Sequence, residues 1–304
     1  MSAVSHNPVE KIVIAEPVQV SVVIPHFFSA RGNNLKGLLD DLREQTIKEM
    51  EVLIVKNISP QGKAINRGVR ETRGEILVII DDDSRLGHSR VIENLVRALR
   101  EDPSIGMAGA SIITAKESNW FRRTAAKQFP RYEMAIAESV VDSDLPGHPC
   151  AAFPKHVFIQ VEMEREDILR GLDPDLRVRI RKAGFRVVLA PQTWAYHPLP
   201  DSLPKFVRVF LRNGYGSAYL QLMHPEINYD TDEAFDSKGF RSKRSFFYRI
   251  FRYPLRLIKS LVTLQWLRLL GYSVYLIGYL GGLVRFSLLR PLFEKNKAAS
   301  GKLN

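Results

Sequence analysis

The chain has 304 residues, of which 45% are hydrophobic and 25% charged, and it contains one cysteine. This composition is typical of a globular protein and argues against large-scale disorder, and the length allows one large α/β domain with an accessory region. The lone Cys150 excludes an internal disulfide and fits a reducing compartment. No basic start followed by a long apolar core is present, so we expect no secretory signal.

The net charge of +11 is concentrated near the C-terminus. Between Ser237 and Phe293 there is no acid, whereas the 33 bases outside this segment balance the 33 acids. The segment contains eleven basic residues, namely Lys238, Arg241, Lys243, Arg244, Arg249, Arg252, Arg256, Lys259, Arg268, Arg285 and Arg290. Because it is also rich in Phe, Tyr, Trp and Leu, it favours an anionic membrane surface as partner. We expect no nucleic acid, with an RNA-binding tail as the alternative.

Strand and helix patterns alternate through the first part of the chain. We expect strands over 18–24, 50–55, 75–80, 105–113 and 185–190, and helices over 35–42, 61–73, 90–100 and 177–183. This order predicts an α/β fold with a mostly parallel sheet, flanked by helices and joined by right-handed crossovers. The loops 26–32, 56–60 and 81–85 would then share one edge of the sheet.

An apolar run, Ile76 to Ile80, stops at three consecutive carboxylates, Asp81, Asp82 and Asp83. A continuous apolar run indicates a buried strand, and ligands of open α/β sheets bind at the carboxyl ends of strands. Two carboxylates about 4 Å apart repel by about 1 kcal/mol in water and about 4 kcal/mol at an effective dielectric constant near 20. Mg²⁺ or Mn²⁺ would relieve this repulsion. A solvated acidic turn is the alternative.

A second acidic stretch begins at Glu162 and leads into a basic helix that ends at Gly184. Pro174 suits the first helical position and Asp173 the N-cap. A helix N-terminus holds a carboxylate ionised, which is also what a general base requires. His197 follows the next strand, where a histidine is more often structural than a ligand.

Several motifs in order resemble the inverting nucleotide-sugar glycosyltransferases of family 2, which have the GT-A fold. The resemblance covers Val18 to about Tyr219. Its motifs are Val20-Ser21-Val22-Val23-Ile24-Pro25, Gly62-Lys63-Ala64-Ile65-Asn66-Arg67-Gly68, Arg73-Gly74-Glu75, Ile79-Ile80-Asp81-Asp82-Asp83, Asp173-Pro174-Asp175-Leu176 through Arg186, and Tyr196-His197-Pro198.

The resemblance implies a metal-dependent transfer of a hexosyl group from a UDP-, GDP- or dTDP-linked sugar. Asp81, Asp83 and His197 would bind Mg²⁺ or Mn²⁺, and Asp173 would be the base. Asp175, Asp167 and Glu166 are alternative bases. The predicted donor contacts are Pro25, His26, Lys56, Asn57, Lys63, Asn66, Asp81, Asp82 and Arg212.

Three places depart from the family pattern. One is His26-Phe27-Phe28, where the family usually has Thr-Tyr-Asn after the first strand. In the family, the second strand usually ends in an acidic residue that contacts the nucleotide base. Here the corresponding segment begins with Lys56, and a lysine cannot accept a hydrogen bond from the base. Leu172 replaces the acidic residue that precedes the base. The alternative hypothesis is therefore a non-catalytic, membrane-bound binding or scaffold protein on a degenerate glycosyltransferase domain.

The C-terminal part predicts a helix over 206–216 that breaks at two glycines. The uncharged run Leu269 to Val284 would span about 24 Å as a helix, against a hydrocarbon core of about 30 Å. Our first interpretation of this run is an interfacial or re-entrant hairpin. The alternatives are a single weak span and burial against a partner subunit.

We expect a lead over 1–17, the GT-A domain over 18–200, a helical membrane-associating region over 201–293 and a disordered polar tail over 294–304. The expected site of action is the cytoplasmic face of the plasma membrane, with a lipid-linked or polysaccharide acceptor, as in cell-envelope synthesis, and a possible homo-oligomer.

Overall fold

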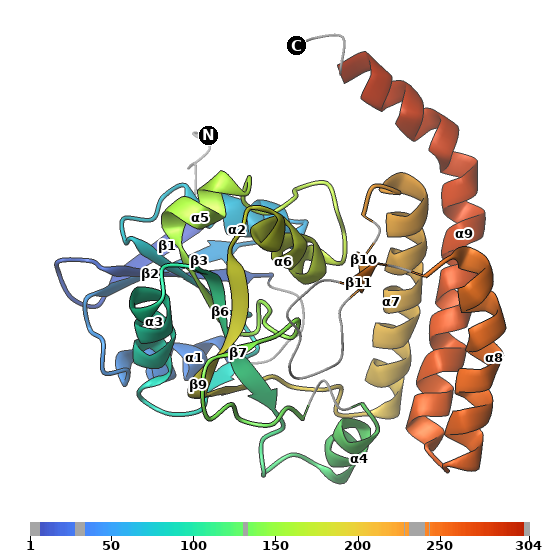
Figure 1. Ribbon diagram of the computed structural model, residues 1–304, viewed down its shortest axis with the longest axis horizontal. Helices are drawn as coiled ribbons and strands as arrows, with labels where there is room; N and C mark the ends of the chain where they lie inside the picture. The colour runs from blue at the N-terminus through green and yellow to red at the C-terminus, as the bar shows by residue number, and fades with distance from the viewer. Residues whose placement is uncertain are drawn as a thin grey trace, which may run out of the picture.

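The computed structural model describes residues 7–27, 34–129, 133–227, 229–230, 241–242 and 244–300 (Figure 1). Nine of the described strands form one sheet in the order β1-β3-β2-β4-β8-β6-β9-β5, with β7 paired to β9. The strands are β1 Val9–Val13, β2 Val20–His26, β3 Met50–Lys56, β4 Ile76–Ile79, β5 Arg85–Leu86, β6 Ile105–Ile113, β7 Val141–Asp142, β8 Ala151–Pro154 and β9 Arg186–Tyr196. A separate pair joins β10 Tyr229–Asp230 to β11 Arg241–Ser242.

The sheet is mixed, although the α/β class is as predicted. Strand β2 pairs in parallel with β3 and β4, and β6 pairs in parallel with β9. Between these two groups lies β8, which runs antiparallel to both β4 and β6. This strand has only four residues, too few for a periodic signal, so the sequence pattern did not reveal it.

Alternating side chains of the central strands build a core on each face of the sheet. Val20, Val22 and Ile24 of β2 join one cluster, and Val23 joins the other. Helices α1 Asn34–Arg43 and α3 Val91–Glu101 cover the first face. Helices α2 Gln61–Val69, α5 Lys155–Gln160 and α6 Leu172–Lys182 cover the second. The central strands β2 and β4 are thereby buried on both faces, which explains their continuous apolar sequences.

The N-terminal lead contributes a strand to the sheet. Strand β1 pairs antiparallel with β3, and Val9 is buried in the second core cluster. The sheet therefore begins earlier in the chain than the predicted domain boundary at residue 18.

Helices α7 Leu203–Met223, α8 Phe246–Val262 and α9 Trp266–Ser300 form the C-terminal region, while the short α4 Trp120–Gln128 lies at its lower end (Figure 1). The predicted break near residue 214 was wrong, because α7 runs through Gly214 and Gly216 without interruption. Gly214 faces α9, and a Cβ atom there would lie 2.0 Å from the carbonyl oxygen of Tyr275. Glycine thus permits close packing of two helices here rather than ending one.

Helix α9 also extends beyond residue 293, so helix covers 294–300 of the predicted disordered tail. Residues 301–304 lie outside the described part of the chain.

Candidate active site

Two carboxylates and one imidazole meet where β4 and β9 end. Asp81 and Asp83 follow β4, and His197 directly follows β9. The Nε2 atom of His197 lies 3.3 Å from Asp83 Oδ1 and 3.7 Å from Asp81 Oδ2. One ligand atom from each of the three side chains lies within 4.8 Å of the others, and all three side chains are partly exposed. The donor set is therefore suited to a divalent cation.

The neighbouring acids of this cluster affect one another's ionisation. Burial, together with the negative charges of Asp83 and Asp173, raises the pKa of Asp81 to about 6, against the opposing effect of His197 and His148. Gln61 donates a hydrogen bond of 2.7 Å to Asp81 Oδ1, which fixes the carboxylate from the start of α2. A cation at this position would favour the ionised form of Asp81.

Asp82 turns away from the cluster. Its side chain is buried, and its Oδ2 lies 2.8 Å from Nδ1 of His26 at the end of β2. The central residue of the acidic triplet thus links two neighbouring strand ends.

The sequence predicted Asp173 as the N-cap of a helix, but the structure places it as the second residue of α6. The cap position belongs to Gly171, whose φ of 86° is in the left-handed region that glycine adopts without strain. Asp173 Oδ1 accepts a hydrogen bond of 2.8 Å from the backbone N–H of His148. A Cβ atom at Gly147 would lie 2.9 Å from the same oxygen, so glycine leaves room for this carboxylate.

His148 connects Asp173 to the acidic cluster, and sequence analysis did not identify it. Its Nδ1 lies 3.1 Å from Asp173 Oδ1, and its Nε2 lies 2.8 Å from Glu164 Oε1. Its carbonyl oxygen accepts a hydrogen bond from the backbone N–H of Asp81. Burial alone would lower the pKa of His148, but the charges of Asp173 and Glu164 outweigh it and raise the pKa to about 10. His148 is therefore an imidazolium held between two carboxylates.

The sequence carried only an indirect signal for His148. It lies in a loop, where no periodicity marks it. Gly147 and Pro149 on either side indicate only a turn or loop.

The three alternative bases are each paired with an arginine. Asp175 is buried, and its Oδ2 lies 2.8 Å from Arg179 Nε. Asp167 Oδ2 lies 3.2 Å from Arg165 Nη2. Glu166 accepts hydrogen bonds of 3.0 Å from Arg70 and from Asn66, and these lower its pKa. Asp173 contacts the ring of His148, and its negative charge raises the pKa of Asp81 in the cluster.

The predicted donor contacts fall into two groups. Pro25 and His26 end β2, and Asn57 directly follows β3, where its backbone N–H donates a hydrogen bond of 2.9 Å to the His26 carbonyl. The φ of 55° at Asn57 is one that asparagine tolerates. These three residues lie at the strand ends where the sequence placed them, and His26 contacts Asp82.

The other predicted contacts have different surroundings. Lys56 forms an ion pair with Glu10 of β1. Asn66 is buried, and its amide nitrogen donates to the Glu164 carbonyl. Lys63 and Arg212 are exposed on α2 and α7.

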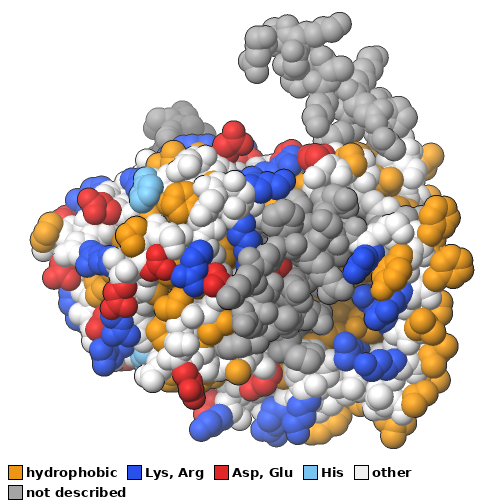
Figure 2. Space-filling model, viewed as in Figure 1, with side chains coloured by type: hydrophobic (Ala, Val, Ile, Leu, Met, Phe, Trp, Pro, Cys, Tyr) orange, Lys and Arg blue, Asp and Glu red, His pale blue; other side chains and the backbone are white. Residues whose placement is uncertain are grey.

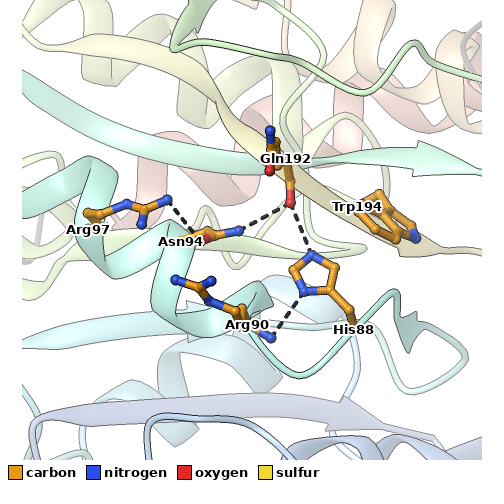
Figure 3. Close-up of a pocket in the computed structure, with 6 residues that line it drawn as sticks. All are labelled: His88, Arg90, Asn94, Arg97, Gln192 and Trp194. Carbon is orange, nitrogen blue, oxygen red and sulfur yellow. Dashed lines mark hydrogen bonds between the residues drawn. The ribbon is translucent and has the colours of Figure 1, made fainter.

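A separate polar pocket of about 330 Å³ opens between α3 and β9 (Figure 3). Its lining residues are His88, Arg90, Asn94, Arg97, Gln192 and Trp194. The carbonyl of Gln192 accepts hydrogen bonds from Asn94 and from the His88 ring, and Arg97 donates to Asn94. None of the predicted site residues lines this pocket.

A model of the glycosyltransferase-like family 2 matches residues 2–216. The chain belongs to this glycosyltransferase family. The match covers more than half of the chain and includes every residue of the cluster, Asp173 and His148. The resemblance read from the motifs is thereby confirmed, and with it the α/β fold class.

Curated relatives of this family 2 chain are glycosyltransferases. Glycosyltransferase AglD of Haloferax volcanii is 28% identical over 163 residues, which are 53% of this chain and 25% of the relative. An N-acetylglucosaminyltransferase of Rhizobium sp. strain N33 is 26% identical over 175 residues, which are 53% of this chain and 38% of the relative. The family 2 chain thus spans well under half the length of these relatives. Among solved structures, the mannosyltransferase PcManGT from Pyrobaculum calidifontis, in complex with GDP-Man and Mn²⁺, aligns with a TM-score of 0.49 at 15% identity and covers 94% of this chain and 80% of its own.

Proposed function

We propose that the protein transfers a sugar from a nucleoside-diphosphate donor to an acceptor hydroxyl, with inversion at the anomeric carbon. The observation that supports this best is the convergence of a cation-binding donor set, Asp81, Asp83 and His197, with the partly exposed carboxylate of Asp173 through His148. Membership of the glycosyltransferase family gives the reaction class.

The donor set fits a divalent cation. Carboxylate oxygens suit Mg²⁺ and Mn²⁺, and the imidazole nitrogen of His197 favours Mn²⁺ of the two. A bound ion would supply positive charge against the diphosphate that leaves when the glycosidic bond breaks. Asp81 and Asp83 would hold it from the β4 end and His197 from the β9 end.

Asp173 is the proposed base. Its carboxylate would take the proton from the acceptor hydroxyl, and the hydroxyl oxygen would attack the anomeric carbon on the face opposite the diphosphate. The N-terminus of α6 stabilises its negative charge, and the two donors of His148 fix its orientation. We propose that His148 is a positioning residue, acting through Asp173.

The donor and acceptor are assigned by class. His26, which contacts Asp82, and Asn57 are the proposed nucleotide contacts at the strand ends, and Lys63 and Arg212 are candidates for the diphosphate. Two curated relatives are named N-acetylglucosaminyltransferases, so a nucleotide-linked N-acetylglucosamine is the first donor to test. The basic, aromatic C-terminal region supports a lipid-linked or glycan acceptor at the cytoplasmic membrane face.

Calorimetry with UDP, GDP and dTDP, each with and without Mn²⁺, tests the donor site. We expect one nucleotide to bind only when Mn²⁺ is present. A non-catalytic scaffold, the alternative raised by Lys56 and Leu172, would bind none of them in a metal-dependent way.

The Asp173→Asn variant tests the base. It should bind the donor with unchanged affinity and lose transfer by about 100-fold or more, the usual range of general-base catalysis. An active Asn variant would contradict the assignment of Asp173, and the same substitution at Asp167 is the matched comparison, because Asp167 is paired with Arg165.

A further inference from the structure

Helix α8 exposes an apolar strip along its whole length. Phe247, Phe251, Leu255, Ile258 and Val262 are each more than half exposed, with values from 55% to 76%. Their spacing of three or four residues places them on one side of the helix. The opposite side is turned inward: Tyr253 and Leu257 are partly buried and Ser260 is buried.

Basic side chains border this strip. Arg244, Arg252, Arg256 and Lys259 are all exposed. The guanidinium groups of Arg244 and Arg252 lie 5.7 and 5.8 Å from the ring centroid of Tyr248. The sequence has no acid from Ser237 to Phe293 that could neutralise them. Figure 2 shows hydrophobic side chains along the edge occupied by α8 and α9, with Lys and Arg beside them.

Helix α9 continues the apolar surface on its outer side. Ile277, Leu280, Val284 and Leu288 are 52% to 76% exposed and again follow a helical spacing. The inner side of α9 carries the buried residues Leu267, Gly271, Val274, Gly278, Gly282 and Phe286. Three of these are glycines, and Gly278 and Gly282 face the backbone of α7.

We propose that α8 and the outer side of α9 lie flat in the interface of a bilayer that contains anionic lipids. The apolar strip would enter the acyl boundary by about 5–10 Å, and the basic residues would contact the headgroups. The proposal deepens the proposed function by naming the surface at which the acceptor is met, but lipid binding itself requires no turnover.

A flat arrangement fits the packing better than a crossing helix. The stretch Trp266–Leu289 is, by length and composition, long and apolar enough to cross a membrane. Its inner side, however, is packed against α7, which carries Lys205, Arg208 and Arg212. A crossing α9 would have to separate from α7 or take these charges toward the hydrocarbon, where charged residues are strongly disfavoured.

The charge pattern also selects lipid over a second copy of this chain. Two copies docked through this surface would bring two basic borders together, and the segment 237–293 that carries these borders has no acid to pair with them. An anionic membrane supplies the complementary charge.

Flotation with preformed vesicles tests the surface. We expect the wild-type protein to bind phosphatidylcholine–phosphatidylglycerol vesicles at least tenfold more tightly than pure phosphatidylcholine vesicles. The double variant Phe251→Ser/Leu255→Ser should lose at least tenfold in binding. Ile159→Ser, which alters an apolar residue on α5 that is also more than half exposed, should bind like the wild type. Equal binding by all three proteins would overturn the proposal.

A charge-matched pair tests the basic border. Arg252→Glu/Arg256→Glu should weaken binding to the anionic vesicles much more than Lys116→Glu/Lys182→Glu, which changes the net charge equally at exposed positions elsewhere. Equal losses in the two double variants would show that only net charge matters, and would contradict headgroup contacts by Arg252 and Arg256. Concentration-dependent dimerisation, abolished by the Phe251 and Leu255 changes with no vesicle binding, would assign the surface to a second copy instead.

Measuring the depth of labels on α9 in the bilayer distinguishes a helix that lies flat from one that crosses the membrane. Single cysteines at Ile277, Val284 and Leu288, labelled with a fluorophore, should be quenched equally by lipids brominated at one depth, and the native Cys150 is buried and gives no background. A crossing helix would separate the first and last label by about 16 Å in depth and overturn the proposal. Metal-dependent nucleotide binding, measured without vesicles, reports separately on the proposed function.

Discussion

At the scale of single residues, the acids of the triplet contact histidines at two different strand ends. Asp83 faces His197, whereas Asp82 faces His26. We therefore expect Asp83→Asn to lower Mn²⁺ affinity by about 100-fold, because it would remove a proposed ligand, and Asp82→Asn to lower it by less than about tenfold. Calorimetric titration of Mn²⁺ checks both values. Equal losses would contradict the separation of the two carboxylates.

Metal affinity should depend on pH through Asp81. Its pKa of about 6 means that below this pH a proton must leave before an ion can bind. We expect Mn²⁺ affinity to be constant above about pH 7 and to fall by about tenfold per pH unit well below pH 6. Titrations between pH 5 and pH 8 measure this, and an affinity that does not change across the range would contradict the ligand role of Asp81.

His148 should make stability fall in alkaline solution. Its pKa is raised from 6.5 to about 10, so its contribution to the free energy of unfolding is complete below about pH 6.5 and is lost as the pH rises through about 10. The difference in unfolding free energy between the wild type and His148→Gln should therefore shrink between pH 6 and pH 10. Urea unfolding at several pH values measures it, and a constant difference would mean that His148 is not charged in the folded protein.

The sequence predicted the candidate site only in part. Asp81, Asp83 and Asp173 were predictable, because each stands at the end or start of an element with a clear pattern. His148 was not, since its role depends on a contact with Asp173 that joins residues 25 positions apart. The partners of Lys56 and Asn66, Glu10 and Glu164, depend on tertiary packing in the same way.

At the scale of elements, the α7–α9 interface depends on glycine. A Cβ atom at Gly278 would lie 2.1 Å from the carbonyl oxygen of Leu211, whereas one at Gly281 would meet nothing within 4 Å. We expect Gly278→Ala to destabilise the protein by about 1–3 kcal/mol through overpacking. Gly281→Ala should stabilise it by up to about 1 kcal/mol through helix propensity.

Thermal or urea unfolding of the two variants measures the difference. The same outcome for both would mean that the helices do not pack as described. Long elements with regular periodicity, such as α3 and β6, were predictable from the sequence, but a glycine looks the same whether it breaks a helix or permits a close contact.

At the scale of the whole molecule, the C-terminal helices pack against one another and against α4 and α6. Phe206 of α7 and Leu267 of α9 share a buried cluster, and Ala218 and Phe286 share another. A chain that ends at residue 245 would expose both clusters to water. We expect it to self-associate and to unfold at a temperature several degrees lower than the full chain.

Sedimentation velocity and thermal unfolding test this expectation, and a monomer with unchanged thermal stability would contradict it. The order of the strands was the least predictable feature at this scale. Strands β5, β7 and β8 have two, two and four residues, so their places in the sheet are decided by tertiary contacts and not by local pattern.

The buried amide of Asn66 has a mechanical consequence. Its nitrogen donates to the Glu164 carbonyl, and its oxygen accepts from the Glu164 N–H, so α2 is joined to the segment that leads to Asp173. Lys63 on α2 and Asp173 would therefore shift together if the protein opened to admit a donor or release a product. Hydrogen exchange at the Glu164 amide should be as slow as that of α2, and the hinge of any such opening must lie outside this joined pair.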